Sequence, residues 1–377
     1  MKRILIVYVF LYAAFTVPAQ TNVNSIPLQG GLLPYGLMLG TDPASGTDSS
    51  EWHRIYGQIL VNQTNTWLRQ QFVRWSDIEL SPGVYTFTSA VVRGVRNHSF
   101  DTWLAANTVA NFNATIAPLP IHQPKIMFNV FNAPPWIVYT NSTQAGYIAA
   151  ETNLVKAILR HAPGRIWTLE FTNEPFTNLY PGCITYSNTA VFVAQLAAAV
   201  RRAVHDVDPT VLIAGPSLTS PYDNNFMSWF SAAGGFTNID LVAFHDYRMS
   251  GTSGTTNDTT FTPTQNSDSP FITNLAACVS NLNGWSGGKP IFVTELGLGI
   301  PMSNVIAYVM MANQLKIGGL APTYFLGNYN SNLNTVGYWN YAKDRPSPNG
   351  AAYIATMFSV NRPAAAAGHP KKPRTQE

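Results

Sequence analysis

Short apolar runs alternate with longer segments of helical periodicity along most of this chain. The apolar runs predict strands at residues 33–39, 67–72, 125–130, 166–171, 211–214, 239–244, 291–294 and 323–326. Apolar residues at helical spacing predict helices at 50–61, 144–160, 189–207, 271–282, 304–316 and 349–358. This alternation is typical of a parallel sheet covered by helices. Eight strand–helix units favour a single α/β domain with a TIM (β/α)8 barrel over a doubly wound sheet, because no glycine-rich turn follows the first strand.

The two ends differ from the middle of the chain. Residues 1–19 combine Lys2 and Arg3 with an apolar run and a small residue before a plausible cleavage point, the pattern of a signal peptide. The run is shorter than the roughly 20 residues of a membrane span, although an uncleaved anchor stays open. Residues 361–377 form a basic tail rich in Pro and Ala, expected to be disordered. We therefore expect a barrel over 20–360 in a secreted or periplasmic protein without membrane association.

Composition narrows the ligand class. Hydrophobic residues make up 46% of the chain and charged residues only 11%, so Asn, Thr, Ser and Tyr must solvate much of the surface. Such a surface suits neutral, hydroxyl-rich ligands, and the net charge of +3 is too small to predict nucleic acid binding. We expect a monomer. Cys183 and Cys278 could pair in an oxidising compartment, and the sequence leaves this open.

Polar residues cluster where the predicted strands end. Because barrel enzymes place their active residues at the carboxyl ends of the strands, these positions are the candidate site. They are Thr172-Asn173-Glu174-Pro175 after strand 166–171, His245-Asp246-Tyr247 after strand 239–244, Glu295 after strand 291–294, and Arg69 on strand 67–72, with Arg74 as its rival.

Two carboxyl groups facing each other across a sugar are what glycoside hydrolysis requires. One protonates the leaving oxygen, and the other attacks the anomeric carbon or activates water. Glu174 and Glu295 follow strands that lie nearly opposite in an eight-stranded ring. Arg69 would hold a nucleophilic carboxylate ionised, and Tyr247 would orient it by a hydrogen bond. Trp side chains at the rim would offer flat faces to sugar rings.

Three motifs, LEFTNEP, FHDYR and VTELG, occur in this order. Together they resemble the clan A of retaining (β/α)8-barrel glycoside hydrolases, which includes family 5 cellulases and mannanases and family 39 xylosidases. FVRWSDIELSPGVYTF is similar to the segment that follows strand 2 in families 39 and 42. The resemblance implies Glu174 as acid/base and Glu295 as nucleophile, with Asn173, His245, Tyr247 and Arg69 as substrate-binding or orienting residues. The clan's Trp at the end of strand 8 is missing, so Tyr324, Phe325 or Trp339 must replace it.

The remaining candidates keep two interpretations. Trp136 is a sugar platform or a core residue. Glu170, a charged residue inside a strand, must face a polar centre or an ion pair. Glu79 is read as a loop residue or as a support for the site.

The predicted function is endo-acting cleavage of β-glycosidic bonds in a polysaccharide or oligosaccharide, with retention of configuration and without a cofactor or metal. The alternatives are a transglycosylase that uses the same glutamates, and a catalytically idle carbohydrate-binding barrel. Gly215-Pro216-Ser217 lacks the second glycine of a serine-hydrolase elbow, and no His-Glu-x-x-His spacing occurs.

Overall fold

The computed structural model describes residues 36–39, 67–70, 73–88, 91–92, 95–96, 98–106, 125–138, 143–175, 180–218, 224–246, 270–296, 312, 315, 317–318, 339–340 and 345–346. The expected signal peptide, the basic tail and the predicted helices at 50–61 and 349–358 lie outside these residues. Within the described part, no helix is long and apolar enough to cross a membrane.

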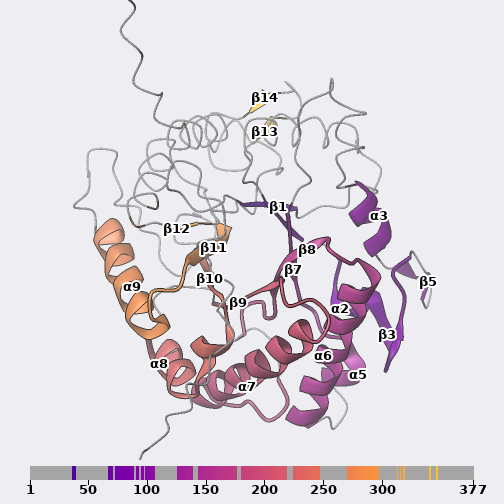
Figure 1. The fold of residues 1–377 in the computed structure, drawn as a ribbon, viewed down its shortest axis with the longest axis horizontal. Helices are drawn as coiled ribbons and strands as arrows, with labels where there is room; N and C mark the ends of the chain where they lie inside the picture. The colour runs from indigo at the N-terminus through magenta and orange to yellow at the C-terminus, as the bar shows by residue number, and fades with distance from the viewer. Residues whose placement is uncertain are drawn as a thin grey trace, which may run out of the picture.

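An eight-stranded sheet forms the centre of the molecule (Figure 1). Its order is β1-β2-β7-β8-β9-β10-β11-β12, and every neighbouring pair is parallel. The strands are β1 Gly36–Leu39, β2 Trp67–Gln70, β7 Lys125–Asn129, β8 Ile166–Glu170, β9 Leu212–Leu218, β10 Leu241–Asp246, β11 Ile291–Leu296 and β12 Ile317–Gly318. Cα atoms of β1 come within 8 Å of those of β11, so the sheet curls back on itself. The predicted TIM-barrel fold is confirmed.

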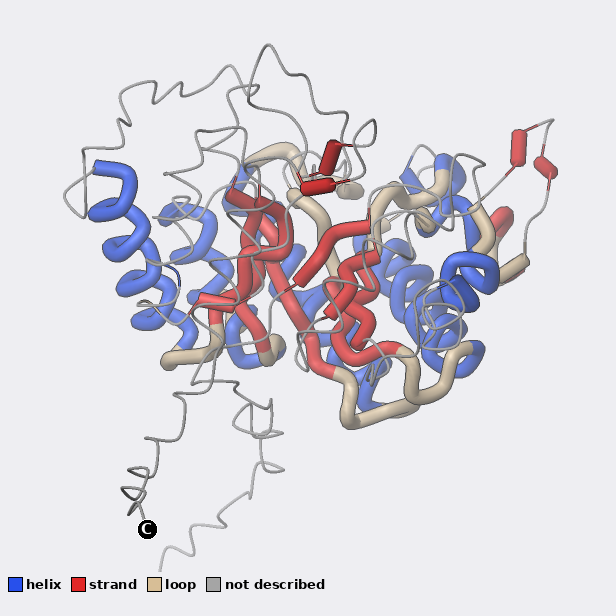
Figure 2. Tube along the Cα trace, turned by 90° about the horizontal axis from the view of Figure 1, so that it is seen from above, coloured by secondary structure: helices blue, strands red, loops and turns tan. Residues whose placement is uncertain are grey.

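Helices lie outside this sheet and cover it on both sides in the view from above (Figure 2). They are α2 Trp75–Ile78, α3 Phe100–Ala106, α5 Pro135–Val138, α6 Gln144–His161, α7 Tyr186–His205, α8 Asn224–Ala232, the 3-10 helix η2 Gly235–Asn238, and α9 Pro270–Ser286. Three short antiparallel pairs complete the described elements: β3 Glu79–Ser81 with β4 Val84–Tyr85, β5 Val91–Val92 with β6 Val95–Arg96, and β13 Trp339–Asn340 with β14 Arg345–Pro346.

Alternating side chains of the strands build two separate cores. The smaller core fills the barrel and consists of Trp67, Met127, Leu212, Ala214, Leu241, Ala243 and Phe292. The larger core packs the outward side chains of the strands against the helices. Apolar side chains of the inner core lie toward the amino ends of the strands. The polar side chains that follow them on the same face therefore gather at the carboxyl ends.

Most predicted elements that fall in the described residues agree with the structure to within two or three residues, with the following exceptions. Strand β9 runs four residues beyond its predicted end at 214, through Gly215 and Pro216. Helix α9 runs four residues beyond its predicted end at 282, and helices α2, α3, α5 and α8 were not predicted. The eighth strand of the sheet is β12 at Ile317–Gly318, whereas the predicted strand at 323–326 lies outside the described residues. Cys183 and Cys278 do not form a disulfide in the structure.

Candidate active site

Arg69 is the centre of a polar cluster at the carboxyl ends of the strands. It lies two residues after Trp67 on β2, so strand alternation turns it toward the barrel interior, where it is completely buried. Its Nε donates to Glu170 Oε2 at 2.6 Å, Nη1 to Glu295 Oε1 at 2.7 Å, and Nη2 to Asn173 Oδ1 at 3.0 Å. One guanidinium therefore joins β2, β8 and β11.

A bulge in β11 turns Glu295 toward this cluster. Ile291 and Val293 pack in the outer core, so strict alternation would point Glu295 outward as well. However, β10 and β11 change register: Phe244 is opposite Val293, and the next pair is His245 with Glu295. The skipped residue of β11 shifts the alternation by one position, a common device beside active sites. Glu295 thereby reaches Arg69, and its side chain is 3% exposed.

Glu174 is fixed by an unusual backbone after β8. Its φ is +48°, in the left-handed region that costs a residue with a side chain about 1–2 kcal/mol, and its N–H donates to the Ser217 carbonyl at 2.9 Å. Ser217 itself has a φ of +55° and lies at a second bulge, where β9 changes register against β10. The Glu174 side chain is 20% exposed, so this carboxyl meets solvent while Glu295 does not.

His245 lies between the two glutamates. Its Nδ1 is 2.8 Å from Glu174 Oε1, and its Nε2 is 3.4 Å from Glu295 Oε1. The ring can donate from Nδ1 to an ionised Glu174, or accept at Nδ1 from a protonated one. The tautomer of His245 is therefore coupled to the protonation of Glu174.

The same three side chains are spaced closely enough to ligate a cation. Three potential ligand atoms, one each from Glu174, His245 and Glu295, all lie within 4.8 Å of one another. Arg69 already donates to Glu295, and its positive charge would oppose a metal ion there. Burial by itself lowers the pKa of Arg69, but the charges of Glu170 and Glu295 outweigh it and raise that pKa above its usual value. The guanidinium therefore stays charged.

The structure brings together five of the predicted site residues: Arg69, Asn173, Glu174, His245 and Glu295. Arg74, the rival of Arg69, is exposed. Trp136 lies on α5, half-buried, and packs against the outer core. Trp339 lies on β13, and Tyr247 falls outside the described residues. Glu79 is buried and accepts from Trp75 Nε1 at 2.6 Å and from the Gly83 N–H at 2.8 Å, which makes it a support of the β3–β4 hairpin.

Two residues of the cluster were not among the predicted site residues. Asn129, the last residue of β7, donates from Nδ2 to Glu170 Oε2 at 2.9 Å. Ser217 donates from Oγ to Glu170 Oε1 at 2.7 Å. For Asn129 the sequence held a signal, because it follows Met127 by two positions and so shares its inward face.

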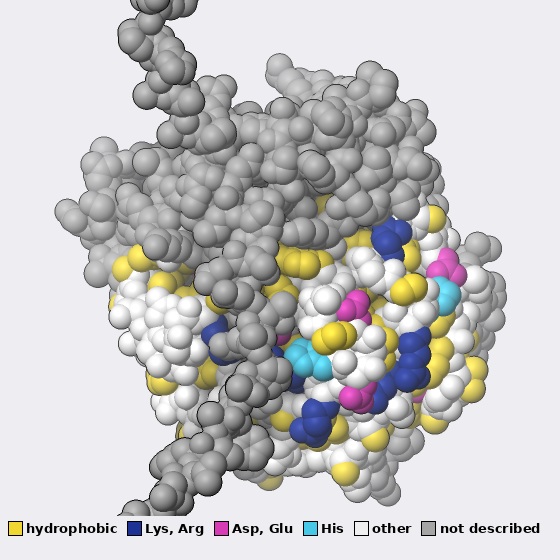
Figure 3. All heavy atoms as spheres, viewed as in Figure 1, with side chains coloured by type: hydrophobic (Ala, Val, Ile, Leu, Met, Phe, Trp, Pro, Cys, Tyr) yellow, Lys and Arg dark blue, Asp and Glu magenta, His cyan; other side chains and the backbone are white. Residues whose placement is uncertain are grey.

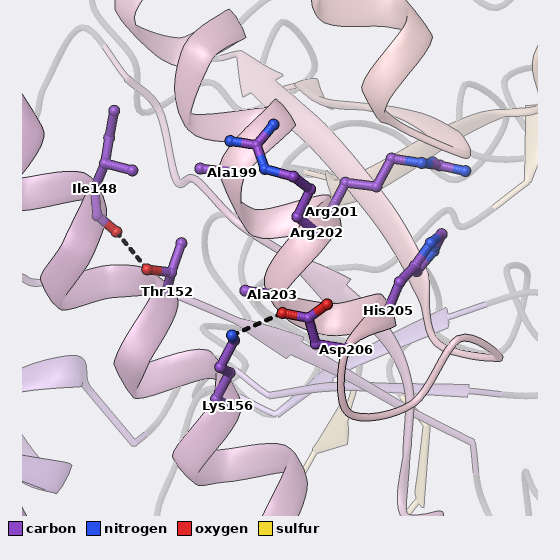
Figure 4. Close-up of a pocket in the computed structure, with 9 residues that line it drawn as sticks. All are labelled: Ile148, Thr152, Lys156, Ala199, Arg201, Arg202, Ala203, His205 and Asp206. Atoms are coloured by element: carbon purple, nitrogen blue, oxygen red, sulfur yellow. Dashed lines mark hydrogen bonds and ion pairs between the residues drawn. The ribbon is translucent and has the colours of Figure 1, made fainter.

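A separate recess lies on the outer layer of helices. This groove of about 600 Å³ runs between α6 and α7 and is lined by Ile148, Thr152, Lys156, Ala199, Arg201, Arg202, Ala203, His205 and Asp206 (Figure 4). Lys156 Nζ donates to Asp206 Oδ2 across it at 2.8 Å. Basic side chains, with acidic ones among them, are visible on this face of the molecule (Figure 3). None of the lining residues belongs to the Arg69 cluster.

Comparison with known proteins identifies the fold. No family model matches the sequence, and no curated protein is similar to it in sequence. Among solved structures, a GH39 β-xylosidase from Caulobacter crescentus has a TM-score of 0.55 at 12% identity, over 87% of this chain and 71% of that chain. A GH10 xylanase from Bispora sp. MEY-1 with xylobiose has a TM-score of 0.55 at 14% identity, over 89% and 99%.

A glycoside hydrolase family 5 enzyme from Prevotella bryantii B14 has a TM-score of 0.53 at 11% identity, over 91% of this chain and 98% of that chain. The protein therefore has the (β/α)8 fold of glycoside hydrolases. The resemblance to families 5 and 39 that the motifs predict is confirmed at the level of the fold.

Proposed function

We propose that this protein is a retaining glycoside hydrolase that cleaves β-glycosidic bonds of a polysaccharide or oligosaccharide by double displacement. The observation that carries the proposal is the pair Glu174 and Glu295, whose nearest carboxylate oxygens lie within 4.8 Å. Retaining enzymes place their two carboxyl groups about 5–5.5 Å apart, whereas inverting enzymes leave about 6.5–9.5 Å for a water molecule. The short separation favours direct attack by one carboxylate.

The environments of the two glutamates suit different roles. Glu295 is buried and held by Arg69 Nη1, which favours an ionised nucleophile that attacks the anomeric carbon. Glu174 is partly exposed and in contact with His245, a position from which it can protonate the departing oxygen and later deprotonate water. Asn173 Oδ1 accepts from Arg69, which holds the Asn173 amide beside the two glutamates, where it would contact a sugar hydroxyl. Tyr247 and a rim Trp would complete the sugar site.

The substrate class follows from the same chemistry and from the neighbours. Among the described residues, Arg69 is the cation that contacts the buried carboxylates Glu170 and Glu295, and this charge balance suits a neutral sugar better than an acidic one. The solved structures that share the fold include a β-xylosidase and a xylanase with xylobiose. We therefore propose a neutral, β-linked glycan as substrate, cut internally by a secreted or periplasmic monomer.

The stereochemistry of the first product tests this proposal. A panel of β-linked glycans and aryl β-glycosides identifies a substrate, and proton NMR follows the reaction before mutarotation. We expect the β-anomer to form first, and an α-anomer would exclude double displacement. If the products are longer oligosaccharides and no new reducing ends form, the protein is a transglycosylase. No turnover on any substrate, combined with retained glycan binding, would indicate an idle binding barrel.

Variants then assign the two roles. Glu295→Gln should keep the fold and lower turnover by several orders of magnitude, because the nucleophile is lost.

Glu174→Ala should retain the first step on substrates with good leaving groups, because these need little protonation. Azide should then restore turnover, because it replaces the water that the missing base would activate. Equal loss on good and poor leaving groups, with no effect of azide, would make Glu174 structural.

A further inference from the structure

Glu170 is a completely buried carboxylate that the proposed reaction does not use. It ends β8, four residues before Glu174, and its two oxygens accept three side-chain hydrogen bonds. Oε2 accepts from Arg69 Nε at 2.6 Å and from Asn129 Nδ2 at 2.9 Å, and Oε1 accepts from Ser217 Oγ at 2.7 Å. The three donors come from β2, β7 and β9, so the carboxylate is enclosed by the two strands beside β8 and by β2.

Two carboxylates share one cation in this interior. Arg69 gives its Nε to Glu170 and its Nη1 to Glu295, and all three side chains are at most 3% exposed. Water screens such buried charges poorly, so each carboxylate acts strongly on the other. Glu170 therefore withdraws part of the stabilisation that Arg69 would otherwise give to Glu295.

The geometry also fixes the guanidinium. The hydrogen bond from Arg69 Nε to Glu170 on β8 fixes the orientation of the guanidinium plane. Nη1 and Nη2 then point at Glu295 and Asn173. Without a partner at Nε, the guanidinium could rotate about its side chain and lose one of these two contacts.

We propose that Glu170 is a positioning residue of the active site. Glu170 orients Arg69, and it also shares the positive charge of Arg69 with Glu295. Arg69 then keeps Glu295 ionised without binding it so strongly that attack on the sugar is hindered. This inference rests on the proposed glycosidase function. The charged or titratable groups that face Glu295 from the described strands are Arg69 on β2, Glu170 and Glu174 on and after β8, and His245 on β10.

The variant Glu170→Gln tests the division of charge. Glutamine has nearly the same shape, its oxygen can accept from Arg69 and Asn129, and its amide can donate to the Ser217 hydroxyl. The contacts are kept and the negative charge is removed, so Arg69 acts on Glu295 alone. We expect the acidic limb of the kcat/KM profile against pH to move to lower pH by about one unit. An acidic limb that coincides with that of the wild type would overturn the proposal.

The variant Ser217→Ala should move the profile in the opposite direction. It removes a donor to Glu170 Oε1, so the charge of Glu170 is less dispersed and its effect on Glu295 grows. We expect the acidic limb to move to higher pH, and this measurement decides the matter if Glu170→Gln does not fold. A shift in the same direction as that of Glu170→Gln, or no shift, would contradict the division of charge.

Glu295→Gln separates this inference from the proposed function. If Glu295→Gln is inactive and Glu170→Gln leaves the profile unchanged, the positioning role is wrong and the glycosidase mechanism stands. If Glu295→Gln keeps full turnover, the proposed nucleophile itself is wrong.

Discussion

At the scale of single residues, Arg69 explains why this cluster needs an arginine. Its planar group donates in three directions at once, to two carboxylates and an amide oxygen. A lysine carries the same charge on one atom and cannot match this geometry. The site therefore depends on the shape of the cation as well as on its charge.

We predict that Arg69→Lys lowers both turnover and stability. The loss of two of the three directed contacts should lower kcat roughly 10²–10³-fold. Breaking a buried ion-pair network should lower the free energy of unfolding by about 3–5 kcal/mol. Enzyme kinetics and urea unfolding measure the two effects. The control is Arg74→Lys, an exposed arginine on the loop after the same strand, which should change neither. Similar behaviour of the two variants would remove Arg69 from its central role.

The sequence identified most of this cluster but not its inner support. Glu174 and Glu295 stand out because they follow apolar runs, and Glu170 because a charge inside a strand requires a partner. Asn129 and Ser217 were missed, since an uncharged polar residue at a strand end is common on protein surfaces too. The spacing from Met127 places Asn129 on the inward face, but the hydrogen bonds that Asn129 and Ser217 donate to Glu170 are seen only in the structure.

At the scale of secondary structure elements, two bulges decide which side chains enter the site. The alternation of inward and outward side chains along a strand can be predicted from the sequence. A bulge, whose extra residue reverses this alternation, cannot be predicted in the same way. The bulge in β11 brings Glu295 inward, and the bulge in β9 brings the Ser217 hydroxyl to Glu170. The register shifts depend on the neighbouring strand, so they follow from pairing in three dimensions and not from local preference.

Gly215 on β9 gives a prediction about the contact between β8 and β9. A Cβ at this position would overlap the ring of Phe171, which is buried in the outer core and has no room to move. We expect Gly215→Ala to lower the free energy of unfolding by about 1–3 kcal/mol. It should also lower kcat, because Phe171 directly precedes the segment that carries Glu174.

The matched control is Gly284→Ala on the exposed side of α9, where a Cβ would meet nothing within 4 Å. Alanine favours a helix, so this variant should gain about 0.5–1 kcal/mol with unchanged kcat. Thermal unfolding of both variants measures the difference. A stable and fully active Gly215→Ala protein would refute the close approach of the two strands.

Glu151 on α6 predicts a dependence of stability on pH. It is completely buried, burial raises its pKa well above the usual value, and its Oε1 has no hydrogen-bond partner among the described residues. A pKa that is higher in the folded state means that the folded state binds the proton more tightly. The stabilisation is therefore fully present below the unfolded pKa of about 4.3 and is lost as the pH rises toward the folded pKa.

We predict that Glu151→Gln is more stable than the wild type at neutral pH, by roughly 1–3 kcal/mol, and that this gain shrinks toward pH 4. Urea unfolding between pH 4 and pH 8 measures this difference in stability.

The variant Asp206→Asn, at the residue that faces Lys156 across the groove in Figure 4, should show the opposite dependence on pH. A hydrogen bond from Lys156 lowers the pKa of Asp206, so that variant should lose stability above the Asp pKa and match the wild type below it. Parallel pH profiles for the two variants would contradict this account.

At the scale of the whole molecule, the barrel could be predicted although no family model and no curated protein matches the sequence. Solved structures that share the fold are 11–15% identical to this chain, so the prediction rested on the alternation of apolar runs with amphipathic helices and on a few short motifs. Strand order followed from the chain order, because consecutive parallel strands joined by helices lie side by side. Strand β12 was not predicted, since Ile317 and Gly318 are too short a run to be recognised as a strand.

The separation of the clustered residues along the chain has a consequence for folding. Arg69 and Glu295 are 226 positions apart, and Arg69 and Glu170 are 101 apart. Contacts between such distant residues form slowly, because long stretches of chain must be ordered first. A barrel that lacked only β11 would already bury Arg69 against Glu170 but would leave Glu295 without its cation. The contact between Arg69 and Glu295 exists in the closed ring alone, so it favours complete closure over half-closed forms.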